Sequence, residues 1–172
     1  FNILALTFTN KAAREMKDRV IELIGDGDAR NVWMGTFHSV FAKILRIDGH
    51  HLGYPSNYTI YDSTDSKRLI KNIIGEMKLD IKQYSPAYVA NRISMAKSSL
   101  ISTTDYSNDP DILAADESSR KPLIKDIYSS YQARLRRADA MDFDDLLMQC
   151  VILFRKHPEV LKKYQDMWHY IM

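Results

Sequence analysis

Two successive strand–turn–helix units open this chain, and they constrain its fold more than any other feature. Residues 1–8 form a short apolar run typical of a buried strand. Apolar residues then recur at three- and four-residue spacing from Ala13 to Ile24, which predicts an amphipathic helix. A second strand at 32–34 and a second helix ending near Gly49 repeat the pattern. Because strands that alternate with helices form parallel sheets, the pattern predicts an α/β fold.

Polar side chains follow both predicted strands at their carboxyl ends. Residues 7–11 lie at the end of the first strand, and residues 36–39 lie at the end of the second. Ligands of parallel α/β sheets bind where the strands end. We therefore expect these two segments to form one ligand-binding edge.

Helical patterns dominate the chain after Gly53. A brief extended piece at 58–61 precedes them, the polar stretch 102–110 is predicted to be a loop, and residues 170–172 form a candidate strand. The predicted helices begin at the caps in 62–65, at Pro86, near Arg120, after the caps in 141–145, and at Pro158. The predicted fold class is therefore α/β but predominantly helical.

Composition sets limits on the class of protein. No stretch approaches the roughly 18 consecutive apolar residues of a membrane span, so we expect no membrane. The single cysteine, Cys150, cannot form an internal disulfide and fits a reducing, cytoplasmic location. Its apolar neighbours favour a buried thiol over a nucleophile. The formal net charge of +2 does not by itself indicate a nucleic-acid-binding protein.

Three sequence blocks together carry a resemblance to a known family. The first block, TFTNKAAREM at residues 7–16, resembles motif Ia of the UvrD/Rep/PcrA family of superfamily 1 DNA helicases. Residues 35–39, GTFHS, with 44–46, ILR, resemble the family's next block. Residues 141–147, MDFDDLL, resemble a third block, which in the family lies just before the Walker B motif. The blocks occur in the family's order, which makes the match specific.

The resemblance implies a RecA-like motor domain with a helical insertion. Residues 1–53 and 139–172 would belong to the motor domain and form a partial RecA-like parallel sheet. Residues 54–138 would form an inserted all-helical subdomain. In the family, the Walker A and Walker B strands would lie outside a chain with these ends. We therefore expect open sheet edges, through which two copies could self-associate.

The resemblance also implies an ATP-dependent DNA helicase that translocates on single-stranded DNA and unwinds duplexes. Its partners would be single-stranded DNA and the duplex junction, and its cofactors ATP and Mg²⁺. The sequence lacks the Gly-x-x-x-x-Gly-Lys-Ser/Thr loop that cradles phosphates. We therefore expect no cofactor on this chain and neither ATP hydrolysis nor unwinding by it alone. The competing hypothesis is a non-catalytic helical protein-interaction module with an α/β stub.

The first block would contact DNA through Thr7, Phe8, Thr9, Asn10 and Lys11. The Phe8 ring can stack on an unpaired base, the short polar side chains can bind phosphate or sugar, and Lys11 can add a phosphate contact. The residues alone leave an alternative open, in which Phe8 belongs to the core and Thr9 or Asn10 only caps the helix.

The second block would contact DNA through Thr36, Phe37, His38 and Ser39. His38 can donate to a phosphate or stack on a base. A structural, hydrogen-bonding histidine is the alternative for this position. Gly35 is expected to meet a backbone requirement at the end of the strand.

Two further groups suggest metal binding at first sight. Asp142, Asp144 and Asp145 lie at a predicted helix start, where carboxylates cap the helix and meet its dipole, so we favour capping over a metal site. The adjacent His50 and His51 lack the nearby companion ligands of a zinc site, and we assign them no role on the sequence.

Overall fold

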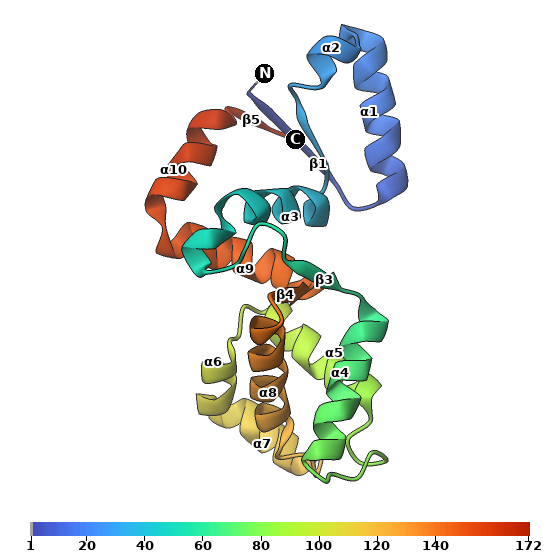
Figure 1. Ribbon diagram of the computed structural model, residues 1–172, viewed down its shortest axis with the longest axis vertical. Coiled ribbons are helices and arrows are strands. Elements are labelled where there is room, and N and C mark those ends of the chain that lie inside the picture. Colours follow the sequence, from blue (N-terminus) through green and yellow to red (C-terminus); the bar gives the residue numbers. More distant parts are fainter. Residues whose placement is uncertain (1) are drawn as a thin grey trace. The chain divides into compact units, whose positions relative to one another are not determined.

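The computed structural model describes residues 2–172, which fall into two compact units. Unit 1 contains the chain up to Asn57 together with Gln149–Met172, and unit 2 contains Tyr58–Met148. The fold is α/β and predominantly helical, which confirms the predicted fold class (Figure 1). Among residues 2–172, we find no helix whose length and apolar character would let it cross a bilayer.

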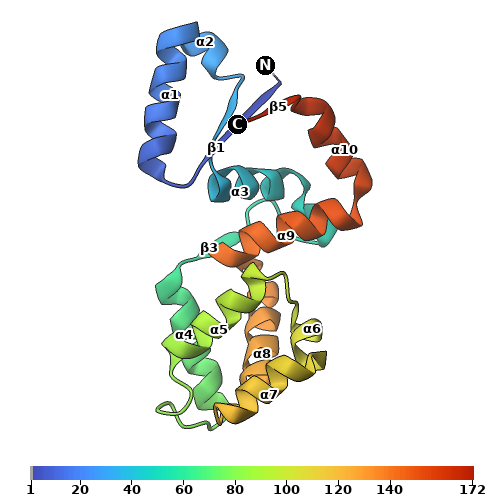
Figure 2. The ribbon, with the colours of Figure 1, turned by 180° about the vertical axis from the view of Figure 1, so that it is seen from behind.

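Unit 1 is built on a small parallel sheet. The central strand β1 (Ile3–Thr7) lies between β2 (Trp33–Thr36) and β5 (Tyr170–Ile171), and it is parallel to both (Figures 1 and 2). The pairing of β1 with β2 places Thr7 opposite Thr36. The two strands therefore end side by side, and the predicted parallel sheet, including the candidate strand at the end of the chain, is confirmed.

The helices of unit 1 bury their apolar faces to different degrees. α3 fully buries Ile44 and Leu45, whereas no described residue of α1 is fully buried. The predicted stripe on α1 is therefore only partly covered. The helices wholly within this unit are α1 (Asn10–Ile24), α2 (Asp26–Ala29), α3 (Phe37–Asp48), the 3-10 helix η1 (Gly49–Leu52) and α10 (Pro158–Met167).

Unit 2 has a closed helical core. α4, α5 and α8 pack together, and one buried cluster joins their apolar faces. The stripe predicted on α8, which includes Ile127 and Leu135, is buried there as expected. Its helices are α4 (Ser63–Glu76), α5 (Pro86–Ser98), α6 (Thr103–Asn108), α7 (Pro110–Ser118) and α8 (Ile124–Arg137), and α9 (Phe143–Lys156) continues from unit 2 into unit 1.

Two local features of unit 2 differ from expectation. The predicted loop at 102–110 is wrong, because α6 occupies most of it. Ser102 and Asp105 form a reciprocal capping box, and the Tyr106 ring is buried with 1% of its surface exposed. The extended piece near residue 60 is β3 (Thr59–Tyr61), which pairs in parallel with an unanticipated strand, β4 (Ala140–Asp142).

Candidate nucleic-acid interface

The two segments predicted to bind DNA lie next to each other at the end of the sheet. Thr7 and Thr36, the last residues of β1 and β2, are opposite each other in the strand register. Phe8 follows the first strand and Phe37 begins α3 after the second, and their ring centroids are 5.3 Å apart. The expected common edge is therefore present in the structure.

Phe8 projects into solvent at this edge. Its side chain is 87% exposed, so the alternative that places it in the core is wrong. Phe37 lies beneath it at a tilt of 35° and in turn contacts Phe41 edge to face at 6.1 Å. An exposed phenyl ring supported by a second ring presents an open aromatic face of the kind that stacks on unpaired bases.

Threonine caps fix the backbone on both sides of this aromatic pair. The Ala12 N–H donates to Thr9 Oγ1 at 3.1 Å, which confirms the capping role considered for Thr9. The Ser39 N–H donates to Thr36 Oγ1 at 3.2 Å, and Ser39 Oγ donates to the Thr36 carbonyl at 2.8 Å. Three of the predicted DNA-binding hydroxyl groups thus position the two loops.

Gly35 is required here by close packing. A Cβ atom at this position would lie 2.5 Å from Ser39 Oγ. Any side chain would therefore displace the Ser39 hydroxyl from its bond to the Thr36 carbonyl. The expected backbone requirement at Gly35 is thus steric, because the position has no room for a Cβ atom.

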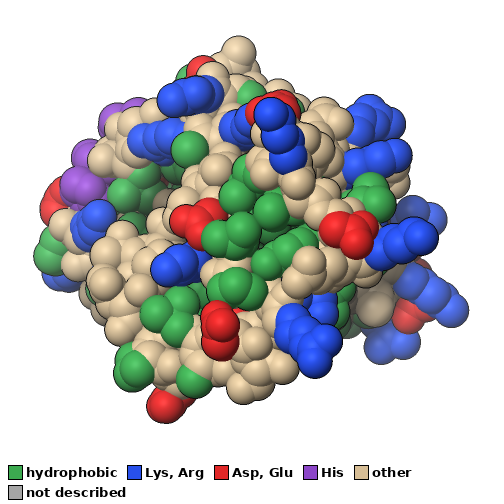
Figure 3. All heavy atoms as spheres, turned by 90° about the horizontal axis from the view of Figure 1, so that it is seen from below, with side chains coloured by type: hydrophobic (Ala, Val, Ile, Leu, Met, Phe, Trp, Pro, Cys, Tyr) green, Lys and Arg blue, Asp and Glu red, His purple; other side chains and the backbone are tan. Residues whose placement is uncertain are grey.

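The charges around this edge favour an anionic ligand. Lys11 is exposed, with Nζ 3.9 Å from Glu15 Oε1, and Asn10 beside it is also exposed, whereas His38 is half-buried. Within the described residues, neither α1 nor α3 carries an acidic side chain in its first turn, so their positive dipole ends are not neutralised locally. Elsewhere charge is dispersed: on the face in Figure 3, Lys and Arg are interspersed with Asp and Glu.

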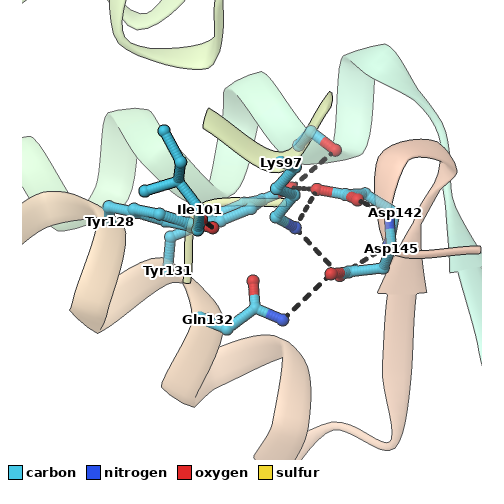
Figure 4. Close-up of polar contacts among 8 residues, drawn as sticks. Lys97, Ile101, Tyr128, Tyr131, Gln132, Asp142 and Asp145 are labelled. Atoms are coloured by element: carbon cyan, nitrogen blue, oxygen red, sulfur yellow. Dashed lines mark hydrogen bonds and ion pairs between the residues drawn. The ribbon is translucent and has the colours of Figure 1, made fainter. Parts of the chain in front are cut away.

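The third sequence block forms a buried ion-pair network in unit 2. Lys97 Nζ lies 2.7 Å from Asp142 Oδ2 and 2.9 Å from Asp145 Oδ2, and its ammonium points between the two carboxylates (Figure 4). The Tyr131 hydroxyl donates to Asp142 Oδ2 at 2.8 Å. The Asp145 N–H donates to Asp142 Oδ1 at 2.8 Å, so the predicted capping by Asp142 is confirmed.

Burial and the paired charges together set the protonation of this network. Burial alone would lower the pKa of Lys97, but Asp145 and Asp142 outweigh it and raise that pKa, which keeps the ammonium charged. Burial also raises the pKa of Tyr131. Sequence reasoning did not single out Lys97, although it lies four residues after the core residue Ile93. Cys150 is buried as predicted, and burial raises the pKa of its thiol to about 12.

The described residues do not fit ATP and Mg²⁺. The phosphate-cradling loop is absent from the sequence. The buried carboxylates Asp142 and Asp145 already bind the Lys97 ammonium. No step of ATP hydrolysis is therefore assigned to these residues.

Comparisons with known proteins show the family to which the chain belongs. The whole chain, residues 1–172, matches the UvrD/REP helicase N-terminal domain family. It is 43% identical over 171 residues to the ATP-dependent DNA helicase PcrA of Staphylococcus aureus strain Mu50 and 40% identical over 171 residues to that of Leuconostoc citreum. Each match covers 99% of this chain but 22% of the relative, so the chain spans about a fifth of their length. The chain therefore belongs to the UvrD/REP helicase N-terminal domain family.

Proposed function

We propose that this chain is part of an ATP-dependent helicase that translocates on single-stranded DNA and unwinds duplexes at their junctions. Within it, Thr7–Lys11 and Thr36–Ser39 contribute single-stranded DNA contacts. The observation that carries this proposal is the exposed Phe8 ring, which stands on Phe37 where two parallel strands end together. Family membership and the PcrA relatives support the same activity.

The edge offers separate groups for base and backbone. The outer face of Phe8 stacks on an unpaired base, an interaction of about 1–3 kcal/mol per base that tolerates any sequence. Lys11 and the N-terminal ends of α1 and α3 attract the phosphates on either side. Thr9, Thr36 and Ser39 hold the loops in place, so their contribution to binding is mainly positional.

The proposal also assigns each part of the chain to a domain of the helicase. We propose that residues 1–53 and 139–172 belong to the motor domain and that residues 54–138 are its helical insertion. ATP and Mg²⁺ bind to parts of the parent protein that this chain does not contain, so the chain alone does not turn over ATP. DNA-stimulated phosphate release by the purified 172-residue chain would contradict this statement.

Fluorescence anisotropy with a labelled oligothymidine tests the DNA contacts. We expect salt-sensitive binding that Phe8→Ala weakens by about five- to 150-fold, which corresponds to the loss of one stacked base. We expect His38→Ala to weaken binding in the same direction. Phe143→Ala is the matched control, because Phe143 is also an exposed phenylalanine but belongs to unit 2, where it follows β4 rather than β1 or β2.

The same titration separates the competing function. A helical protein-interaction module with an α/β stub predicts that Phe8→Ala and His38→Ala leave oligothymidine binding unchanged. An equal loss in Phe143→Ala would show nonspecific adhesion to exposed rings. Either result would refute the assignment of DNA contacts to this edge.

A further inference from the structure

A second cluster of potential ligands lies in unit 1 and has no part in the proposed DNA contacts. His51, His157 and Glu159 each offer one ligand atom, and these atoms all lie within 4.8 Å of one another. His157 Nδ1 is 3.1 Å from Glu159 Oε1, and the His51 and His157 ring centroids are 4.9 Å apart. In Figure 3, histidine side chains gather at one edge of the face.

The sequence concealed this cluster because its members come from distant segments. His51 belongs to η1, whereas His157 caps α10 and Glu159 lies in the first turn of that helix. Short spacing in the sequence pairs His50 with His51 and His157 with Glu159, but it does not bring the two pairs together. The chain returns through α9 to bring the other two side chains beside them.

The scaffold under these side chains is already fixed. Asp48, which precedes η1, accepts hydrogen bonds from Lys163 Nζ at 2.8 Å and from the Tyr164 hydroxyl at 2.6 Å. Lys163 and Tyr164 lie on α10, one turn beyond Glu159. The ion pair therefore holds η1 and α10 in register, so a ligand set closes by side-chain rotation alone.

The donor set discriminates between metals. Two imidazoles and one carboxylate, with a fourth position open to water, form a known zinc ligand set. Mg²⁺ and Ca²⁺ prefer oxygen ligands, so they match these three groups poorly. The exposure of His51 and Glu159 leaves an ion free access from solvent.

We propose that His51, His157 and Glu159 form a binding site for a divalent transition-metal ion of the Zn²⁺ type, which ties η1 to the start of α10. The bound ion stabilises unit 1, and the stabilisation grows as the free ion concentration rises above the dissociation constant, because the unfolded chain does not bring the three ligands together. This site is independent of the proposed DNA contacts and does not require ATP.

Isothermal titration of the 172-residue chain with Zn²⁺ tests the site. We expect one Zn²⁺ per chain, not displaced by excess Mg²⁺, and a zinc-dependent rise in the melting temperature followed by tryptophan fluorescence. His51→Ala and Glu159→Gln are expected to weaken binding at least about tenfold, the lower bound for loss of even an outer-shell partner. Both side chains are exposed, so these substitutions leave the core intact.

His50→Ala is the matched control. His50 adjoins His51, but its Nδ1 is 3.2 Å from the Ile47 carbonyl oxygen, and it is not one of the three ligands. The proposal requires that His50→Ala retain wild-type zinc affinity. An equal loss in His50→Ala, unchanged affinity in both ligand variants, or no zinc binding by the wild-type chain would overturn it.

Discussion

Unit 1 presents Phe8, Asn10 and Lys11 to solvent at the strand ends, whereas unit 2 encloses Lys97 and its carboxylate partners in its core. Phe8 in unit 1 is 87% exposed, and no described residue of α1 is fully buried. In unit 2, Lys97 is 1% exposed, Asp145 is fully buried, and Tyr131 closes the network above them. The same kinds of side chain thus serve opposite purposes in the two units.

The exposed groups of unit 1 are available to bind a ligand, whereas the buried groups of unit 2 hold helices in place. Groups held at strand ends by short caps remain available to a ligand, and binding residues are commonly found on such loops. A buried ion pair contributes less to net stability than its geometry suggests, because both charges lose their hydration. We interpret the Lys97 network as a device that fixes α5, α8 and the start of α9 relative to one another within unit 2.

The largest effect is expected when the buried network is broken. Lys97→Met leaves Asp145 and Asp142 buried without their cation, and loss of one partner of a buried pair costs about 3–5 kcal/mol. Trp33 and Trp168 both lie in unit 1, so tryptophan fluorescence follows that unit while far-UV circular dichroism follows all helices. We expect part of the dichroism signal to be lost at a lower urea concentration than in the wild type. The urea midpoint of the fluorescence transition should stay unchanged.

Lys71→Met provides the control for this variant. Lys71 is exposed on α4 in the same unit, so its loss should leave both transitions in place. If Lys97→Met shifts both transitions together, the two units unfold as one and the contrast between them does not extend to stability.

Hydrophobic periodicity predicted the parts of the fold that are determined by the burial of apolar residues. The parallel strands and the stripe of α8 with Tyr128 and Leu135 follow from it, whereas the capped start of α9 follows from its carboxylates. It failed at 102–110, where a polar segment folds because Ser102 and Asp105 cap each other and a single ring, Tyr106, is buried.

Hydrophobic periodicity could not identify side chains whose partners are far away in the sequence. Lys97 is a surface charge by composition and becomes a core residue only because Asp142 and Asp145 lie beside it in the fold. His51 gains its companions more than a hundred residues later in the chain. The edge around Phe8 was predictable because strand ends and helix caps are local features.

A smaller effect is expected from the polar cluster of unit 1. Burial would raise the pKa of Asp48, but hydrogen bonds from Lys163 and Tyr164 outweigh burial and hold that pKa below its usual value of 3.8. The unfolded chain therefore takes up this proton first as the pH falls. The stabilisation is present above the usual carboxyl pKa and is lost as the pH falls through the lower value of the folded state.

Asp48→Asn removes this contribution. We expect a loss of about 1–3 kcal/mol at neutral pH, because the buried Tyr164 hydroxyl and Lys163 lose a charged acceptor. The difference from wild type should shrink as the solution is acidified. Tyr164 stacks on Trp168 with ring centroids 4.9 Å apart, so tryptophan fluorescence reports the change directly. A difference that stays constant down to acid pH would show that Asp48 does not carry the charge in question.

The smallest effect is expected at the open edge itself. Thr9→Ala removes the oxygen that accepts the Ala12 N–H, and loss of an N-cap costs about 1 kcal/mol, confined to unit 1. Thr9→Ser keeps the acceptor and should restore both stability and oligothymidine affinity. If Thr9→Ala instead weakens DNA binding without moving the fluorescence transition, its hydroxyl contacts the ligand directly. The Thr9 hydroxyl would then serve DNA binding rather than internal hydrogen bonding. The open edge would in that case depend less on internal hydrogen bonds than the core of unit 2 does.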